Sequence, residues 1–364
     1  MSMENRTPLY EEHLKLHANM VDFHGWAMPM QYGKIMDEHM YVRNCAGIFD
    51  VSHMGDIIIS GREAEKFLLY LLPTDISVLK DGDAAYTTFL NDNGLIIDDT
   101  IVYRLNRQKF FVVPNVATTE KIYGWILEKS NGFEIEVKNV SDSIACVALQ
   151  GKRSIEVLDK IGFRYPGDFK FYQVEGSKYA ENALTGSNGI IVSGTGYTGE
   201  KGVEFLVPSQ DAVELWRLLI SEVEGIGGGP CGLGSRDTLR MEKGMLLSGT
   251  DFSSDRNPYE CSISFIVTNK NEFIGKKSLE ADKSTQIFRG IKMDGKIIAR
   301  SGSPVYHDDN LIGTVTSGTL SPIIGSAIAL AFIDKKYSKP GTSVDVIVRE
   351  RKVRGVVSRP RMVP

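Results

Sequence analysis

The sequence has few of the features that mark secreted, membrane or nucleic-acid-binding proteins. Its four cysteines, at positions 45, 146, 231 and 261, are far apart and form no Cys-x-x-Cys pair. This spacing is poor for a zinc site and indicates reduced thiols in a reducing compartment. No apolar stretch approaches the roughly 18 residues that span a membrane, so we expect no membrane partner. The formal net charge of -4 argues against a nucleic-acid binder that works through bulk electrostatics.

We expect no secretory signal, because Met1-Ser2-Met3-Glu4-Asn5-Arg6 has neither a basic nor an apolar segment. We therefore expect a cytoplasmic protein, or one of the mitochondrial matrix if a transit peptide has been removed. His13 and His17 have the i,i+4 spacing that chelates a metal from a helix, but no third ligand follows in the pattern. Solvated helix positions are the expectation for both histidines, and no metal site is predicted.

The length and composition predict a globular protein of several domains. The chain has 364 residues, of which 42% are hydrophobic and 24% are charged, and this length suits two or three domains with a large core. Hydrophobic periodicity predicts helices over residues 8–20, 34–45, 63–72, 118–130, 154–161 and 210–224. Beyond about residue 250 helices become scarce and β-type segments recur, which predicts a separate all-β C-terminal domain.

A turn and an apolar run carry the first candidate site. Asn91-Asp92-Asn93-Gly94 precedes Leu95–Tyr103, and Asn-Gly between apolar segments is the strongest short-range hairpin signal. Successive side chains of a strand point to opposite faces, so Asp98 and Asp99 lie on different faces. At least one carboxylate is expected to face an apolar interior, where it needs hydrogen-bond donors. Either one of them lines a ligand pocket, or both sit near an exposed sheet edge and oppose aggregation.

A second segment has the glycine pattern of a dinucleotide site. Gly194-Thr195-Gly196-Tyr197-Thr198-Gly199 satisfies G-x-G-x-x-G, but a dinucleotide site needs a helix directly after the glycines. Here a second strand, Val203–Val207, follows, so we interpret the segment as a hairpin. Glu204 interrupts that strand, and its spacing alone is typical of a solvent-facing position. A basic cluster near the C-terminus, which includes Arg351 and Arg354, is typical of a solvated hairpin face and could also meet an acidic partner.

Several motifs together resemble one family along nearly the whole chain. They are Arg6-Thr7-Pro8-Leu9-Tyr10, Asp22-Phe23-His24-Gly25-Trp26, Phe49-Asp50-Val51-Ser52-His53-Met54-Gly55, Ile97-Asp98-Asp99, Ala148-Leu149-Gln150-Gly151, Thr195-Gly196-Tyr197-Thr198-Gly199-Glu200, Gly232-Leu233-Gly234-Ser235-Arg236-Asp237 and Thr316-Ser317-Gly318-Thr319-Leu320-Ser321-Pro322. Each is weak alone, but their order and spacing resemble the T-protein (aminomethyltransferase) family of the glycine cleavage system.

The resemblance implies an α+β fold of three domains in a cloverleaf-like arrangement around a central folate site. Antiparallel sheets would be flanked by helices. Residues 1–55 plus 142–250 would form a discontinuous folate-binding domain, 56–141 an inserted middle domain, and 251–364 a C-terminal β-barrel or jelly-roll-like domain. It also implies that the aminomethyl group on the lipoylated H-protein passes to tetrahydrofolate, a co-substrate. The products would be 5,10-methylenetetrahydrofolate, ammonia and the reduced lipoyl arm.

Matching the family's motifs also implies residue roles. Asp99 is similar to the family's essential carboxylate, beside the folate nitrogens. Glu204 is similar to the carboxylate that holds the pterin, whose ring N–H and exocyclic amine are parallel donors that one carboxylate can accept. Arg236 resembles a folate-site arginine. Four further positions match residues that line the folate pocket: Tyr86, Met54, Asn115 and Tyr197.

The chain departs from the family pattern at two positions. It has Gly194 where the family usually has Arg, and Lys152 where the family usually has Pro. Three other functions remain open. One is a folate-dependent demethylase of a small methylated amine or sulfur compound. Another is a non-catalytic folate-binding protein of the iron–sulfur assembly type, although its relatives carry Lys-Gly-Cys-Tyr where this chain has Gly194-Thr195-Gly196-Tyr197. The third is a plain interaction module.

Overall fold

The computed structural model describes residues 5–162, 174–175 and 191–364. The chain divides into two compact units. The first unit comprises Met1–Leu68, Ile76–Tyr86 and Thr100–Arg236, and the second unit comprises Leu69–Asp75, Thr87–Asp99 and Asp237–Pro364. The three domain boundaries expected from the sequence follow a different division of the chain and stay predictions.

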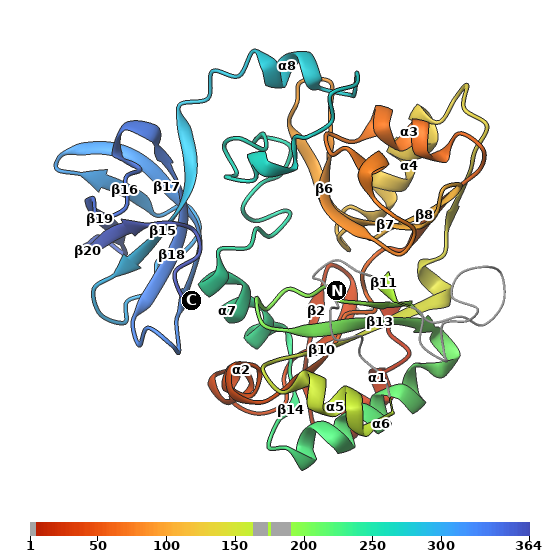
Figure 1. The fold of residues 1–364 in the computed structure, drawn as a ribbon. Helices are drawn as coiled ribbons and strands as arrows, with labels where there is room; N and C mark the ends of the chain where they lie inside the picture. Colours follow the sequence, from red (N-terminus) through yellow and green to blue (C-terminus); the bar gives the residue numbers. More distant parts are fainter. Residues whose placement is uncertain (1–4, 163–173, 176–190) are drawn as a thin grey trace. The chain divides into compact units, whose positions relative to one another are not determined.

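A six-stranded sheet forms the centre of the first unit (Figure 1). In the sheet order β11-β12-β13-β10-β4-β14, the strands are Val174–Glu175, Ile191–Ser193, Gly202–Pro208, Ile144–Gln150, Gly47–Asp50 and Gly229–Pro230. Every residue of β10 is buried, because this strand lies between neighbours and under helices. Helix α6 (Ala212–Gly225) packs on β10 and β4, α5 (Ser154–Lys160) packs on β13, and α2 (Ile35–Asn44) packs on β4.

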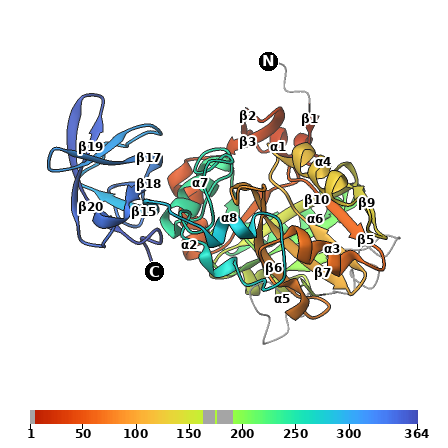
Figure 2. The same cartoon turned by 90° about the horizontal axis from the view of Figure 1, so that it is seen from above.

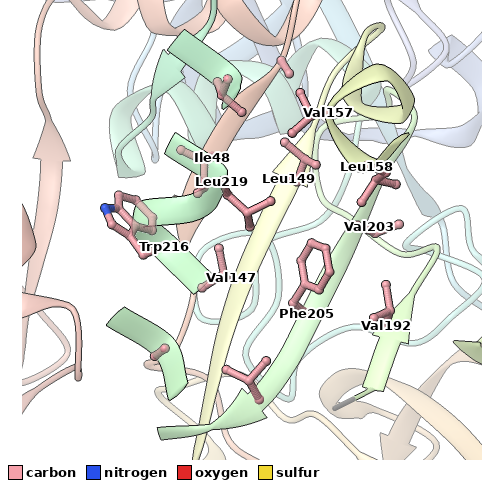
Figure 3. Packing of buried hydrophobic residues seen from close by; sticks show 14 of the residues in the cluster. Ile48, Val147, Leu149, Val157, Leu158, Val192, Val203, Phe205, Trp216 and Leu219 are labelled. Atoms are coloured by element: carbon pink, nitrogen blue, oxygen red, sulfur yellow. The ribbon is translucent and has the colours of Figure 1, made fainter. Parts of the chain in front are cut away.

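Apolar side chains between α6 and the sheet form the core of the first unit (Figure 3). Helix α6 has the apolar stripe expected from its sequence, and Trp216, Leu219 and Val223 on that stripe are buried. They face alternate residues of the strands, which point to the same side of the sheet. The residues labelled there are Ile48, Val147, Leu149, Val157, Leu158, Val192, Val203, Phe205, Trp216 and Leu219.

The N-terminal segment differs from the helix expected over residues 8–20. Helix α1 is only Tyr10–Lys15, and the chain then forms a sheet in the order β1-β3-β2 from Asn5–Arg6, Trp26–Gln31 and Asn19–Phe23. The helix ends early because His17 adopts a left-handed φ of 55°. The apolar residues beyond it belong to a hairpin, whose turn His24–Gly25 has φ values of 53° and 86°.

A five-stranded sheet carries the predicted Asn-Gly hairpin. Its order is β6-β7-β8-β5-β9, with bounds Ala84–Leu90, Ile96–Asn106, Lys109–Val112, Ile57–Ser60 and Glu136–Asn139. Helices α3 (Ala64–Leu71) and α4 (Thr119–Lys129) accompany these strands in the sequence. The hairpin is confirmed, because β6 neighbours β7 and Gly94 takes the φ of 73° that the turn requires. The boundary between the two units falls within β6 and within β7.

The second unit contains the predicted C-terminal all-β domain as a closed barrel, seen from above in Figure 2. Its order is β15-β18-β17-β16-β19-β20, with bounds Gln286–Met293, Ala327–Asp334, Asn310–Leu320, Pro304–His307, Ser343–Val348 and Arg351–Ser358. Small and branched side chains fill its interior, among them Ile291, Ala329 and Val346. The basic cluster lies on the β19–β20 hairpin, where Arg351 and Arg354 are exposed.

Two short helices and several 3₁₀ turns complete the described chain. Helix α7 is Leu233–Lys243 and α8 is Lys276–Glu280. The 3₁₀ turns are Ile76–Val78, Ser141–Ser143, Ser209–Asp211, Ser264–Ile266 and Lys335–Tyr337. Among the residues that the structure describes, no helix is long and apolar enough to span a membrane.

Candidate functional site

A half-buried glutamate lies on the central sheet of the first unit. Glu204 is on β13, opposite Ala148 of β10 and Ser193 of β12. The buried hydroxyl of Thr195 donates a hydrogen bond to Glu204 Oε2. Spacing alone suggested a solvent-facing position, and Glu204 is neither fully exposed nor fully buried. Its carboxylate is held in one orientation, as the recognition of a planar pair of donors requires.

The glycine-rich loop before β13 is organised by one side chain. The Gln150 amide donates to the backbone oxygens of Thr195 (3.0 Å) and Val203 (3.3 Å), and its carbonyl accepts from Thr198 Oγ1 (2.8 Å). A Cβ on Gly196 would lie 2.0 Å from Gln150 Oε1, so a larger residue there would displace the Gln150 amide from its hydrogen bonds. Gln150 thus sets the path of the loop that carries Thr195 to Glu204.

An arginine secures the far end of the same loop. Arg43 Nη1 donates to the backbone oxygen of Thr198 (2.8 Å) and to Glu200 Oε1 (2.9 Å). Strand β13 follows the loop directly and pairs antiparallel with β12. The dinucleotide interpretation is thereby excluded as the sequence predicted, because the helix N-terminus that would receive a pyrophosphate is a strand instead.

Arg236 and Tyr197 form a stacked pair in the first unit. The Arg236 guanidinium carbon lies 4.7 Å from the centre of the Tyr197 ring, a cation–π distance. Arg236 Nη1 is buried and has no hydrogen-bond partner among the described residues. A buried guanidinium N–H with no acceptor is costly. It therefore fits a ligand that brings an acceptor, such as a ring nitrogen or a carbonyl oxygen.

Two buried titratable groups of the first unit are held in their neutral forms. Burial, and then the charge of Glu204, raise the pKa of Tyr103 well above its usual range, and the Tyr103 hydroxyl lies 3.3 Å from Thr195 Oγ1. Burial lowers the pKa of His53 to about 4, opposed by Asp50 and assisted by Arg236. His53 is therefore a neutral imidazole at pH 7, and its Nδ1 has no hydrogen-bond partner within the described chain.

The segment around Met54 is packed tightly against the start of α4. Gly55 N donates to the backbone oxygen of Pro114 (3.0 Å), and a Cβ on Gly55 would lie 2.5 Å from Thr119 Oγ1. Met54 directly precedes Gly55, and Asn115 directly follows Pro114. Both are half-buried, and they therefore adjoin the two residues that are in contact. Tyr86 is half-buried on β6 of the same unit. The folate-lining roles of Met54, Tyr86, Asn115 and Tyr197 stay predictions.

The paired aspartates lie on β7 in the second unit. Asp98 is fully buried and accepts a hydrogen bond of 2.7 Å from Ser248 Oγ, whereas Asp99 is half-buried on the opposite face. The expectation that one carboxylate faces the interior is confirmed for Asp98. The edge-strand alternative is wrong, because β7 lies between β6 and β8. The catalytic role of Asp99 stays a prediction.

The expectation of a solvated position is wrong for His13. It is fully buried, with Nε2 2.8 Å from Asp50 Oδ2 and Nδ1 2.8 Å from the Tyr32 hydroxyl. Against the effect of burial, the hydrogen bond from His13 lowers the pKa of Asp50. The described residues contain no group of three or more His, Cys, Asp or Glu side chains that could hold a metal ion. His13 therefore stabilises the end of β4, from which His53 and Met54 follow.

Sequence reasoning missed the residues that hold the candidate carboxylates. Thr195 and Gln150 stood only in motifs that carried the resemblance, without a role of their own. Ser248 carried no signal, since a serine next to a glycine is common in surface turns. Its partner Asp98 lies 150 positions away in the sequence, and only the folded chain brings the two together.

The chain matches known proteins along nearly its whole length. Residues 9–271 match the family model described as "GCVT N-terminal domain", and residues 288–363 match "Glycine cleavage T-protein C-terminal barrel domain". A curated aminomethyltransferase of Caldanaerobacter subterraneus subsp. tengcongensis is 40% identical over 362 residues, covering 98% of this chain and 96% of the relative. That of Staphylococcus carnosus is 41% identical over 358 residues, covering 97% and 96%. The crystal structure of glycine cleavage system aminomethyltransferase T from Bartonella henselae superposes with a TM-score of 0.89 at 30% identity, covering 99% of this chain and 98% of that one.

Proposed function

Because the chain belongs to the glycine cleavage T-protein family and is an aminomethyltransferase, we propose how its residues carry out the reaction. The proposed donor is the aminomethyl group on a lipoylated H-protein, and the proposed acceptor is tetrahydrofolate. The products are 5,10-methylenetetrahydrofolate, ammonia and the dihydrolipoyl arm. In this reaction the folate supplies two nucleophilic nitrogens, and no oxidant or reductant is consumed.

The polar groups of the first unit support a tetrahydrofolate site there. Glu204 is a half-buried carboxylate fixed by Thr195, and the same unit contains Arg236 Nη1 and His53 Nδ1, buried without hydrogen-bond partners among the described residues. A pterin presents parallel N–H donors at one edge and acceptors elsewhere on the ring. Glu204 would accept the donors, and the Arg236 guanidinium would donate to an acceptor.

Asp99 is the residue we propose for the chemistry. Its carboxylate would orient the folate nitrogens, stabilise positive charge as it develops on them, and relay a proton. Acid–base assistance of this kind contributes about 10²–10⁴-fold. Positioning is the larger contribution, since holding both reactants together lowers a barrier by roughly 7–11 kcal/mol at best.

The test is release of ammonia from aminomethylated H-protein with and without tetrahydrofolate. We expect folate to accelerate release strongly in the wild-type protein. We expect Asp99→Asn to lose most of this acceleration, while Asp92→Asn, an exposed aspartate of the preceding turn, retains it. Near-normal turnover of Asp99→Asn would remove Asp99 from the chemistry. Activity on free sarcosine-like substrates without H-protein would favour the demethylase instead.

A further inference from the structure

The second unit contains a buried network that ends on the neighbour of Asp99. We propose that Ser248 and Asp251 are positioning residues for the reaction and act on Asp99 through Asp98. This inference rests on the proposed function, because it takes Asp99 as the catalytic carboxylate. The network consists of the Ser248 hydroxyl on a short loop, the buried Asp251 carboxylate that shapes this loop, and strand β7.

A side-chain hydrogen bond joins the loop to strand β7. Asp98 is fully buried, and Ser248 Oγ donates to its Oδ1 at 2.7 Å, a distance typical of a hydrogen bond from a hydroxyl. Adjacent residues on a strand point to opposite faces. A rotation of the backbone at Asp98 therefore turns Asp99 as well, and the hydrogen bond from Ser248 restrains the backbone from which the Asp99 side chain projects.

Backbone hydrogen bonds fix the shape of the loop around Ser248. Asp251 N donates to the backbone oxygen of Leu247 (2.8 Å), and Gly249 N donates to that of Phe252 (2.8 Å). Ser248 forms an isolated β-bridge with Phe252. These bonds close the chain on both sides of Ser248, so its hydroxyl is presented from a rigid turn.

The buried carboxylate of Asp251 holds the loop in place. Asp251 is buried, and its Oδ2 accepts from Arg240 Nη1 (2.7 Å) and Leu247 N (2.9 Å). Its Oδ1 accepts from Thr316 Oγ1 (2.5 Å) and Ser317 Oγ (2.7 Å). Four donors on one buried carboxylate satisfy its charge. Asp251 thereby ties the loop to α7 and to β17 of the barrel.

A separate bond keeps β7 in place when Ser248 is changed. Ile96 N donates to the backbone oxygen of Arg256 at 2.8 Å, and neither residue depends on the Ser248 side chain. Loss of the Ser248 hydroxyl should therefore leave the strand paired and remove one restraint on Asp98, so that the backbone at Asp98 and Asp99 can rotate by a small angle within the paired strand. The expected effect is on turnover, with little effect on folding.

The experiment compares variants of Ser248 in the full chain with loaded H-protein. We expect Ser248→Ala to lower kcat by about 10- to 100-fold, the scale of a catalytic group displaced by a fraction of an ångström to 1 Å. The affinity for tetrahydrofolate, measured by calorimetry, should stay within about 2-fold. Ser248→Thr keeps the hydroxyl and should recover most of the turnover. Ser321→Ala is the matched control, because Ser321 Oγ donates to buried Glu242 Oε1 at 2.5 Å in the same unit.

A double variant separates this inference from the proposed function. If Ser248 acts through Asp99, Ser248→Ala should have no further effect on kcat in an Asp99→Asn background. If Asp99→Asn is impaired and folded Ser248→Ala keeps wild-type kcat, the positioning role is wrong while the proposed function stands. If Asp99→Asn turns over normally, the catalytic assignment itself fails. Should Ser248→Ala not fold, Ser248→Cys, which keeps the volume but is a weak donor, gives the same comparison.

The anchor is tested by Asp251→Asn with Thr316→Val beside it. Asp251→Asn weakens the bonds to Arg240 and should lower kcat in the same direction as Ser248→Ala. Thr316→Val removes one of the four donors and should have a smaller effect. A loss of kcat in Asp251→Asn that Ser248→Ala does not share would overturn the route through Ser248.

Discussion

The side-chain amide of Gln150 lies 3.0 Å from the backbone oxygen of Thr195, to which it donates a hydrogen bond. Thr195 in turn donates to Glu204. A residue of β10 therefore determines how the proposed pterin carboxylate is oriented, although it need not touch the ligand. This arrangement makes the orientation of Glu204 sensitive to a substitution on the neighbouring strand.

Gln150→Leu should weaken folate binding and reduce stability. The substitution removes the bond from Gln150 to the backbone oxygen of Thr195 and the acceptor of the buried Thr198 hydroxyl, and leaving a buried polar group unsatisfied costs about 1–3 kcal/mol. We expect the dissociation constant for tetrahydrofolate to rise about 10-fold, measured by calorimetry, with a lower melting temperature. Gln108→Leu, at an exposed position, is the control. Unchanged folate affinity in a folded Gln150→Leu protein would contradict the positioning of the loop by Gln150.

Glu204→Gln tests the carboxylate itself. Gln keeps the shape and can accept from Thr195, but it presents one acceptor and a donor where two parallel acceptors are needed. Hydrogen bonds to a charged group contribute about 1.5–3 kcal/mol, so we expect folate affinity to fall about 10- to 100-fold. Calorimetry with tetrahydrofolate measures this fall, and Glu136→Gln, an exposed strand position, should bind normally. Equal affinities of the two variants would rule out Glu204 as the pterin ligand.

Local sequence signals predicted the elements whose cause is local. The Asn91–Gly94 turn and the alternation along β7 indicated a hairpin and an inward-facing carboxylate, because turn chemistry and side-chain alternation act over a few residues. The strand after the glycine-rich loop was predicted for the same reason. The resemblance supplied the candidate roles of Asp99, Glu204 and Arg236, which spacing alone left undecided.

Long-range partners were beyond sequence reasoning. The spacing of His13 and His17 indicated one helix face, but α1 ends at Lys15 and His13 is buried beside Asp50, which lies 37 positions away. Ser248 and Asp98 are 150 positions apart. Buried hydrogen bonds of this kind depend on the tertiary fold, and a polar residue in the sequence does not reveal whether its partner is water or a distant side chain.

Asp56→Asn should stabilise the protein toward alkaline pH. Asp56 is 2% exposed, its Oδ1 has no hydrogen-bond partner in the described part of the chain, and burial raises its pKa well above the usual range. The folded state therefore holds a proton that the unfolded state releases above its ordinary pKa near 3.8. Stability is fully present below that pKa and falls as pH rises toward the folded-state pKa, by at most about 1.4 kcal/mol per pH unit.

Urea denaturation between pH 4 and pH 8 measures this effect. The neutral Asn side chain has no such proton, so the free energy of unfolding of Asp56→Asn should exceed that of the wild type increasingly as pH rises. Asp142→Asn, which changes an exposed aspartate, should follow the wild type. A difference between Asp56→Asn and the wild type that does not vary with pH would show that Asp56 is ionised in the folded protein.

His53 should make the protein less stable toward acid pH. Burial lowers its pKa from 6.5 to about 4, so between these values the unfolded chain binds a proton that the folded chain refuses. The contribution to stability is present above pH 6.5 and is lost as pH falls toward 4, with a slope of at most about 1.4 kcal/mol per pH unit.

His53→Gln is neutral at every pH and should therefore show a flatter profile of unfolding free energy over this range, whatever its stability at pH 7. His17→Asn is the control, because His17 is exposed and Asn tolerates the left-handed φ of 55° at that position. Parallel profiles for His53→Gln and the wild type would mean that His53 titrates normally in the folded state.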